Sequence, residues 1–217
     1  MTRPESAPFC RRLAVAVVAC VVVGTLHHVR AQTFEFPDFS AEVMTRAGGG
    51  GRSAAAGEST GRFYTSKGRV RTETYRNGVV VNAMIIDARN RTAWQLSPER
   101  KMAVDMSANF AAAQQQANAM VQTPLDPKNP CAALPGATCQ KVGSDTVAGR
   151  STEKWEITEK DGMRMVMWID PALHFALKVQ AAQFEAEFRN VKLAPQPDTL
   201  FQIPADYQRL GPGGRRQ

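Results

Sequence analysis

A chain of 217 residues with 43% apolar residues is long enough to bury one sizeable core, and its composition excludes a largely disordered protein. The formal net charge is +7, but without residues 1–31 the remaining 186 residues hold 23 Lys and Arg and 19 Asp and Glu, a net charge of +4. No stripe of basic residues alternates with aromatic residues, so we expect no nucleic-acid partner.

The N-terminus has the three parts of a secretory signal peptide. Two arginines precede the apolar run Leu13–Leu26, and a small-residue cleavage signal ends at Ala31. The run is shorter than the roughly 20 residues of a membrane span, so we expect cleavage after Ala31 and export to the periplasm or cell envelope. A retained anchor is one alternative. Lipidation at Cys20, which follows a sequence resembling a lipoprotein processing site, is another.

Removal of this signal leaves one domain, residues 32–210, followed by a short tail, 211–217, that we expect to be disordered. The exported chain then contains two cysteines, Cys131 and Cys139. In an oxidising compartment this pair predicts a disulfide, which contributes about 2–3 kcal/mol by closing a short loop. A metal site needs more ligands than these, so we expect none.

Alternating apolar and polar residues predict six strands in the first half of the domain. Asn77-Gly78 separates two β-rich runs and is a strong hairpin signal, because both residues tolerate positive φ. The Gly-, Ala- and Ser-rich segment Gly48–Thr60 is predicted to be a hairpin loop. The connections are too short for helices, which indicates an up-and-down antiparallel sheet. The predicted strands are 39–47, 61–66, 68–76, 79–87, 92–97 and 101–106.

One helix and a second group of strands follow. Ala and Gln favour a helix over Ser107–Gln122, and Pro124 ends it. Strand groups on both sides of one helix predict a mainly β fold with a single strongly curved sheet and a covering helix. The strands of the second group are expected at 140–150, 151–159, 163–170, 175–181, 184–193 and 198–210.

The most specific parts of a longer pattern, which extends from about residue 39 to residue 210, are Trp168–Pro171 and Leu200–Pro204. This pattern resembles the LolA-like family of bacterial envelope proteins, and more specifically its domain-of-unknown-function group. The resemblance implies an unclosed antiparallel β-barrel covered by helices, with an apolar cavity that holds lipoprotein acyl chains in the carrier LolA. Lys67-Gly68 stands where the carrier has Arg-Pro, so the role of that Arg is not transferred.

The methionines are the candidate ligand-binding residues. Met163, Met165 and Met167 alternate along one predicted strand and therefore point to one face. Flexible thioether side chains adapt well to apolar ligands, so we expect these residues to line the cavity. Four aromatic residues are expected to line it with them: Phe63, Trp155, Phe184 and Phe188. The same alternation also builds an ordinary core, and a cavity filled by protein remains the alternative.

No pattern indicates catalysis. His174 is the single histidine after residue 31 and follows Pro171 in a predicted turn, where we expect it to be exposed. Glu185 and Glu187 share a strand face with Arg189, which is typical of a solvated surface. Nucleotide-binding, zinc-protease and dithiol motifs do not occur, so we expect no cofactor and no enzyme.

Arg69 and Arg71 flank Val70 on a predicted strand. They could bind an anionic head group at the mouth of a cavity. Charges in this pattern are more typical of a surface strand at the edge of a sheet, and we expect that role.

Together these patterns predict an exported, non-enzymatic, monomeric protein whose partner is a lipid or a lipoprotein acyl chain. Apolar burial contributes about 0.8 kcal/mol per methylene, so a long chain could bind without polar contacts. The alternative is a protein-interaction or envelope-stress sensing module with a filled core and envelope proteins as partners. An enzyme that uses carboxylates in the cavity is the third hypothesis.

Overall fold

Twelve strands form one sheet in the part of the chain that the structure, a computed structural model, describes: residues 36–47, 57–110, 125–134 and 136–212. These residues belong to one unit, Thr33–Gln217. The expected signal peptide and residues 111–122 of the expected helix lie outside the described residues. The strands are β1 (Phe39–Ala47), β2 (Gly57–Ser66), β3 (Arg69–Arg76), β4 (Val79–Asp87), β5 (Thr92–Ser97), β6 (Met102–Asp105), β7 (Thr138–Val147), β8 (Arg150–Thr158), β9 (Arg164–Asp170), β10 (Phe175–Ala181), β11 (Phe184–Leu193) and β12 (Gln208–Leu210).

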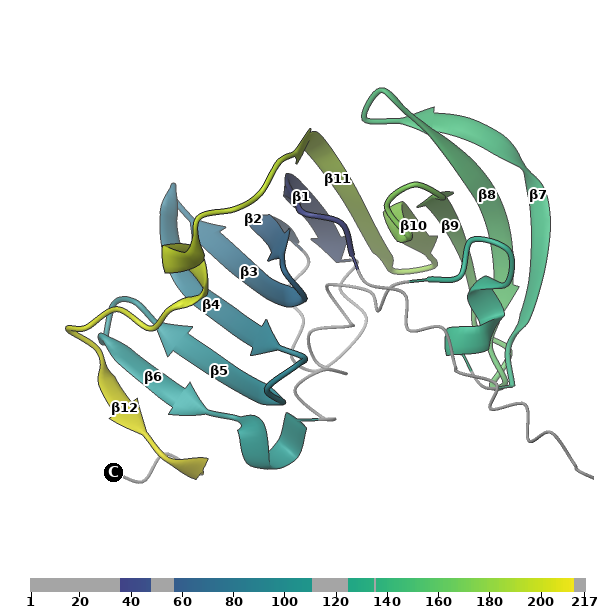
Figure 1. Cartoon of the computed structure of the whole chain (residues 1–217). Helices are drawn as coiled ribbons and strands as arrows, with labels where there is room; N and C mark the ends of the chain where they lie inside the picture. The colour runs from purple at the N-terminus through teal and green to yellow at the C-terminus, as the bar shows by residue number, and fades with distance from the viewer. Residues whose placement is uncertain (1–35, 48–56, 111–124, 135, 213–217) are drawn as a thin grey trace, which may run out of the picture. The chain divides into compact units, whose positions relative to one another are not determined.

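The strand order β12-β6-β5-β4-β3-β2-β1-β11-β10-β9-β8-β7 shows two antiparallel meanders joined along β1 and β11. Figure 1 shows that the sheet is curved and that β7 and β12 are its separate edges. The predicted fold class, a mainly β protein with an unclosed, curved antiparallel sheet, is therefore confirmed. Among the residues that the structure describes, three short 3-10 helices accompany the sheet: η1 (Ser107–Asn109), η2 (Pro130–Ala133) and η3 (Asp198–Phe201).

The predicted loop between β1 and β2 needs correction. The loop Gly48–Thr60 ends earlier than predicted, because β2 begins at Gly57 and pairs with every residue of β1. The hydroxyl groups of Thr45 and Ser59 lie 2.6 Å apart across this pair, so the polar composition of the segment does not prevent pairing.

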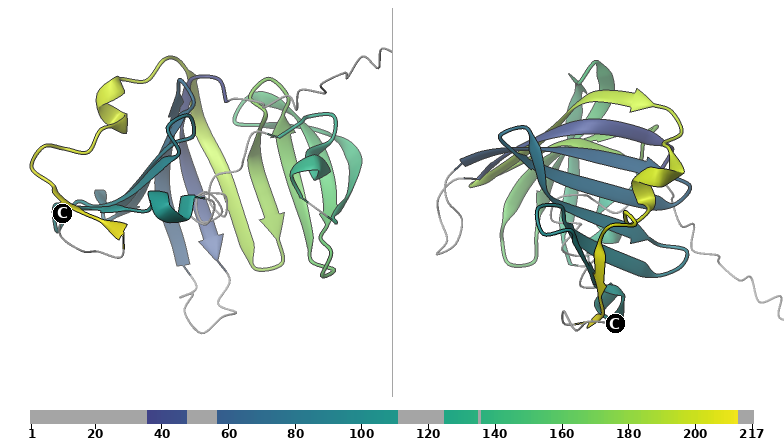
Figure 2. Two further views of the ribbon diagram at one scale, coloured as in Figure 1. Left: turned by 60° about the horizontal axis from the view of Figure 1, so that its bottom comes forward. Right: turned by 90° about the vertical axis from the view of Figure 1, so that its left-hand side faces the viewer.

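The end of the chain is not the continuous strand predicted for residues 198–210. It forms η3, then β12, which is parallel to β6 (Figures 1 and 2). Phe201 is buried, and Leu200, Ile203 and Tyr207 pack against the same apolar cluster on β4, β5 and β6. Proline has no N–H to give to a ladder, and Pro204 interrupts this segment. The C-terminal segment therefore first covers part of the sheet through η3, and then extends the sheet by one short parallel strand, β12.

Arg69 and Arg71 lie on an internal strand, so the prediction of an edge strand was wrong. Arg69 pairs with Asp198 of the C-terminal segment. The Arg71 guanidinium contacts the Glu73 carboxylate at 2.7 Å and donates to the Leu200 carbonyl at 2.9 Å. Both arginines thus attach the C-terminal segment to β3. Neither of the two roles considered from the sequence, head-group binding and charge on an edge strand, included this contact.

Acid should loosen this attachment. Hydrogen bonds from Arg69 and then Lys67 lower the pKa of Asp198, and Lys101 lowers the pKa of Asp206. Because the folded pKa lies below the unfolded one, the stabilisation is present above about pH 4 and is lost as the pH falls through the folded pKa. We expect the rate of hydrogen exchange at Gln208–Leu210, divided by the rate in β4, to rise below about pH 4. A ratio of the two rates that does not change with pH would contradict this.

Candidate functional site

The two faces of the central strands differ in chemistry. Successive side chains along a strand alternate between faces, and directly paired residues share one. By this register Val43, Phe63, Ala186 and Phe188 share a face with Val179 and Met167, which we call the apolar face. The opposite face carries ion pairs of Lys178 with Glu185 and Glu187, at 3.1 and 3.4 Å.

Six of the seven predicted lining residues point to the apolar face. Met167 pairs with Trp155 across β8 and β9, and Met165 pairs with Ile157. Met163 is the exception: it lies in the turn before β9 and is 51% exposed. Its N–H donates to the Asp161 carboxylate at 3.0 Å, so the turn, not the strand, sets its position. The prediction that all three methionines line one strand was wrong for Met163.

The six residues fall into two groups. Phe63 and Phe188 belong to an aromatic cluster with Phe36, Phe39 and Phe175, in which Phe63 and Phe175 stack at 5.1 Å. Phe63 and Phe188 are 0% and 2% exposed. Protein side chains therefore fill this part of the apolar face.

The second group, Trp155, Met165, Met167 and Phe184, belongs to a separate cluster around Ile157 and Ile169, which we call the methionine cluster. All of this group except Met167 are half-buried. Among the described residues, the buried Trp155 indole N–H has no hydrogen-bond acceptor. This part of the apolar face is less completely filled than the aromatic cluster.

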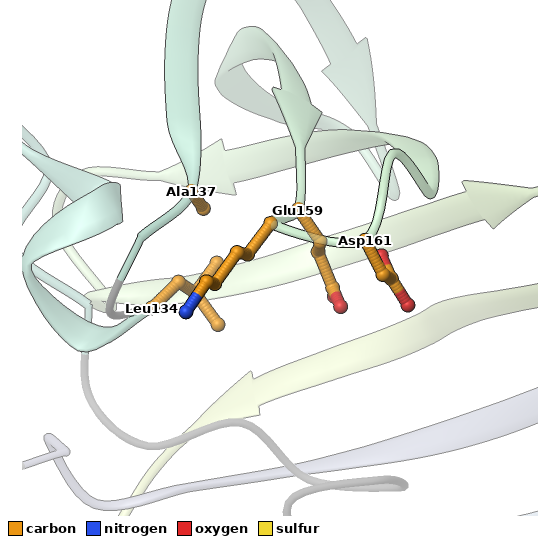
Figure 3. Close-up of a pocket in the computed structure, with 5 residues that line it drawn as sticks. Leu134, Ala137, Glu159 and Asp161 are labelled. Carbon is orange, nitrogen blue, oxygen red and sulfur yellow. The ribbon is translucent and has the colours of Figure 1, made fainter.

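A depression of about 590 Å³ adjoins the methionine cluster at the ends of β7 and β8 (Figure 3). Ala137 and Leu134 contribute its apolar lining and also pack against the methionine cluster. Glu159, Lys160 and Asp161, in the turn between β8 and β9, contribute charged groups. Thr138 pairs with Thr158 and Ile157 with Met165, so Ala137 and Glu159 continue the row of side chains on the apolar face. The volume is within the range of pockets for small organic ligands, about 300–1,000 Å³.

The loop that carries Leu134 is fastened to the sheet at both ends. The predicted disulfide is present: Cys131 and Cys139 are joined, with an S–S distance of 2.01 Å. At the start of the loop, the Leu125 N–H donates to the His174 carbonyl at 2.8 Å, and His174 Nδ1 lies 3.2 Å from the Leu125 carbonyl. His174 is thus half-buried against this loop, and the prediction that it is exposed was wrong.

Loss of the disulfide should affect stability and the depression together. Replacing both Cys131 and Cys139 with serine is expected to lower the free energy of unfolding by about 2–3 kcal/mol, because the unfolded chain regains the entropy of the open loop. The released loop should also expose Leu134 to protease. Urea unfolding with and without a thiol reductant measures the first effect, and the variant should be insensitive to the reductant. A wild-type midpoint unchanged by reduction would contradict the expectation.

The acidic residues that the sequence analysis considered, Glu185 and Glu187, take part in ion pairs. The described residues contain no group of three or more His, Cys, Asp or Glu side chains placed to hold a metal ion. Glu187 accepts from Arg189 at 2.8 Å, and the hydrogen bonds from Arg189 and Lys178 lower its pKa in spite of partial burial. Glu185 and Glu187 are therefore engaged in ion pairs on the charged face, as the sequence predicted.

Sequence reasoning missed every residue of the depression. Residues 160–162 lie between the predicted strands 151–159 and 163–170, and they were expected only to connect those strands. The available signal was the cysteine pair, since a Cys131–Cys139 disulfide fixes the loop that contains Leu134 to the start of β7, the strand next to β8.

The described residues form an open, curved sheet of mostly antiparallel strands, with a depression of apolar and charged lining where β7 begins and β8 ends. No helix among the described residues has the length and apolar character to cross a membrane. No protein-family model matches the chain, and no curated protein matches it.

Solved structures do resemble it. An uncharacterized conserved protein from Thermus thermophilus has a TM-score of 0.53 at 13% identity, over 81% of this chain and 91% of that chain. MucB has a TM-score of 0.54 at 17% identity, over 81% of this chain and 60% of the MucB chain. At these identities the likeness is one of fold alone.

Proposed function

We propose that this protein is an exported, non-enzymatic binding protein that holds the acyl chain of a lipid or lipoprotein against the methionine cluster. The observation that carries this proposal is the depression of about 590 Å³, because its apolar lining continues into the half-buried Met165, Trp155 and Phe184. The aromatic cluster is filled by protein, so the ligand-binding residues proposed here are those near β8 and β9. In this proposal Phe63 and Phe188 are core residues that do not contact the ligand.

Apolar burial supplies the affinity in this proposal. A bound chain contributes about 0.8 kcal/mol for each methylene removed from water, before the costs of association. Two thioether side chains, Met165 and Met167, can change rotamer to fit chains of different length. The site therefore favours a class of apolar chains over one defined molecule.

A charge placed in the methionine cluster tests the proposal. We expect Met165→Asp to weaken binding of the neutral apolar fluorophore N-phenyl-1-naphthylamine by about tenfold or more, because a ligand would then bury a carboxylate. Met165→Leu keeps the apolar volume and should stay within about twofold of the wild type. The measurement is a fluorescence titration of the full chain as its host processes it, with folding checked by circular dichroism.

A second control separates local from general charge effects. Val79 is 65% exposed at the start of β4, which is not a neighbour of β8 or β9, so Val79→Asp adds the same charge away from the site and should leave binding unchanged. Equal loss in the Val79 and Met165 variants, or no loss in either, would contradict a site at the methionine cluster.

The second candidate function is a protein-interaction module. It is favoured by β7, a ten-residue edge strand that is exposed from Gln140 to Thr146. An edge strand presents unpaired backbone groups to which an extended segment can add. Under this alternative the partner would be an envelope protein, and binding would not respond to Met165→Asp.

A further inference from the structure

The charged residues in the turn at the mouth of the depression indicate which polar group the ligand has. The geometry points to an amphiphile whose head group has both an anionic and a cationic centre, such as a phosphate with an ammonium group. Lys160 binds the anionic centre, and Glu159 and Asp161 bind the cationic one. This inference rests on the proposed function for the acyl chain and adds the chemical class of its head group.

The turn holds these three residues in a defined arrangement. The Glu159 N–H donates to the Met163 carbonyl at 2.8 Å, and the Gly162 N–H donates to the Glu159 carbonyl at 2.9 Å. One carboxylate oxygen of Asp161 accepts the Met163 N–H at 3.0 Å. Figure 3 shows the Glu159 and Asp161 side chains extending to the same side of the turn. Two carboxylates are thus presented together beside the apolar lining.

The stem of Lys160 is placed by a contact with the disulfide-bonded loop. A Cβ at Gly136 would lie 3.4 Å from Cδ of Lys160 and 3.5 Å from its Cβ, so the lysine stem passes directly over this glycine. Gly136 also has φ +83°, a conformation that other residues rarely adopt. Packing of the stem against the loop leaves the ammonium at the mouth of the depression. Among the described residues, no carboxylate lies within ion-pair distance of it.

Charge balance selects the class of head group. One ammonium and two carboxylates make the mouth net negative, so a purely anionic head group meets attraction from Lys160 and repulsion from Glu159 and Asp161. A purely cationic head group is attracted by Glu159 and Asp161 and repelled by Lys160. A head group with both signs can satisfy Lys160 and the carboxylates together. Each exposed pair of this kind changes affinity by a few-fold at most, and salt screens it.

The test compares three amphiphiles with the same saturated acyl or alkyl chain, each below its micelle concentration. They are a lysophosphatidylethanolamine, a lysophosphatidylglycerol and an alkyltrimethylammonium salt, and each displaces N-phenyl-1-naphthylamine from the full chain as its host processes it. We expect the lysophosphatidylethanolamine to bind about fivefold more tightly than the other two at low salt. This preference should shrink to less than about twofold in about 0.5 M salt.

Two variants reverse the preference in opposite directions. Lys160→Gln should favour the alkyltrimethylammonium salt, and the double variant Glu159→Gln with Asp161→Asn should favour lysophosphatidylglycerol. Asparagine at 161 keeps an acceptor for the Met163 N–H, so the turn is preserved. Equal affinity for all three amphiphiles, or an unchanged order in both variants, overturns the head-group inference alone. Failure of the wild type to bind the fluorophore and all three amphiphiles overturns the proposed function and the inference with it.

Discussion

Replacing Phe63 with alanine is expected to lower the free energy of unfolding by about 3–5 kcal/mol. The side chain is 0% exposed and lies at the centre of the aromatic cluster, with ring centroids at 5.1 Å from Phe39 and Phe175 and at about 6 Å from Phe36 and Phe188. Truncation removes apolar contacts and leaves a cavity that its neighbours on β1, β10 and β11 cannot close. Urea unfolding followed by circular dichroism measures the effect.

Phe184 is the matched control for this variant, because it is a phenylalanine on the same face but only half-buried in the methionine cluster. Phe184→Ala should cost less than Phe63→Ala, about 1–2 kcal/mol. If the two substitutions cost the same, the distinction between a filled aromatic cluster and an open methionine cluster would be wrong, and with it the position proposed for the ligand.

Asp170→Ala should have the next largest effect, lowering the free energy of unfolding by about 2–4 kcal/mol. Asp170 is 2% exposed and forms an ion pair with Arg150 from the neighbouring strand β8. It also accepts the N–H groups of Ala172, at 2.8 Å, and Leu173, at 3.3 Å, which fixes the turn between β9 and β10. Alanine leaves the Arg150 charge and the Ala172 N–H without their acceptor, whereas the Leu173 N–H can still donate to the backbone carbonyl of residue 170, which lies 3.2 Å away.

Asparagine at position 170 separates the two roles. It retains an oxygen that can accept from Ala172 and Leu173 but carries no charge for Arg150. We expect Asp170→Asn to cost roughly half as much as Asp170→Ala, as measured by the urea midpoint at constant slope. An alanine variant as stable as the wild type would show that neither the ion pair nor the turn hydrogen bonds contribute to stability.

Much of the fold was predictable because period-2 alternation and turn residues act locally. The bounds of Phe39–Ala47, Phe175–Ala181 and Phe184–Leu193 were predicted as the structure has them. Asn77-Gly78 forms the predicted turn with positive φ at both residues. The joining of the two meanders along β1 and β11 pairs residues about 145 positions apart, and no local pattern encodes such a register.

The C-terminal segment and the depression were not predictable for related reasons. Phe201 and Ile203 flank the polar Gln202 as in a strand, but both pack onto strands of the first meander. Leu134 and Asp161 come together only because β7 pairs with β8. Alternation identified the face that carries Met165 and Met167. It could not identify the part of that face that protein side chains fill, because this depends on packing between residues far apart in the sequence.

The most direct test of the account is native mass spectrometry, with lipid extraction, of the full chain purified from the envelope of its own host. We expect a co-purified acyl lipid that is present with the wild type and with Met165→Leu and is lost from folded Met165→Asp. A wild-type protein that carries no lipid and also fails to bind N-phenyl-1-naphthylamine would contradict it, and the interaction module would then be the better explanation.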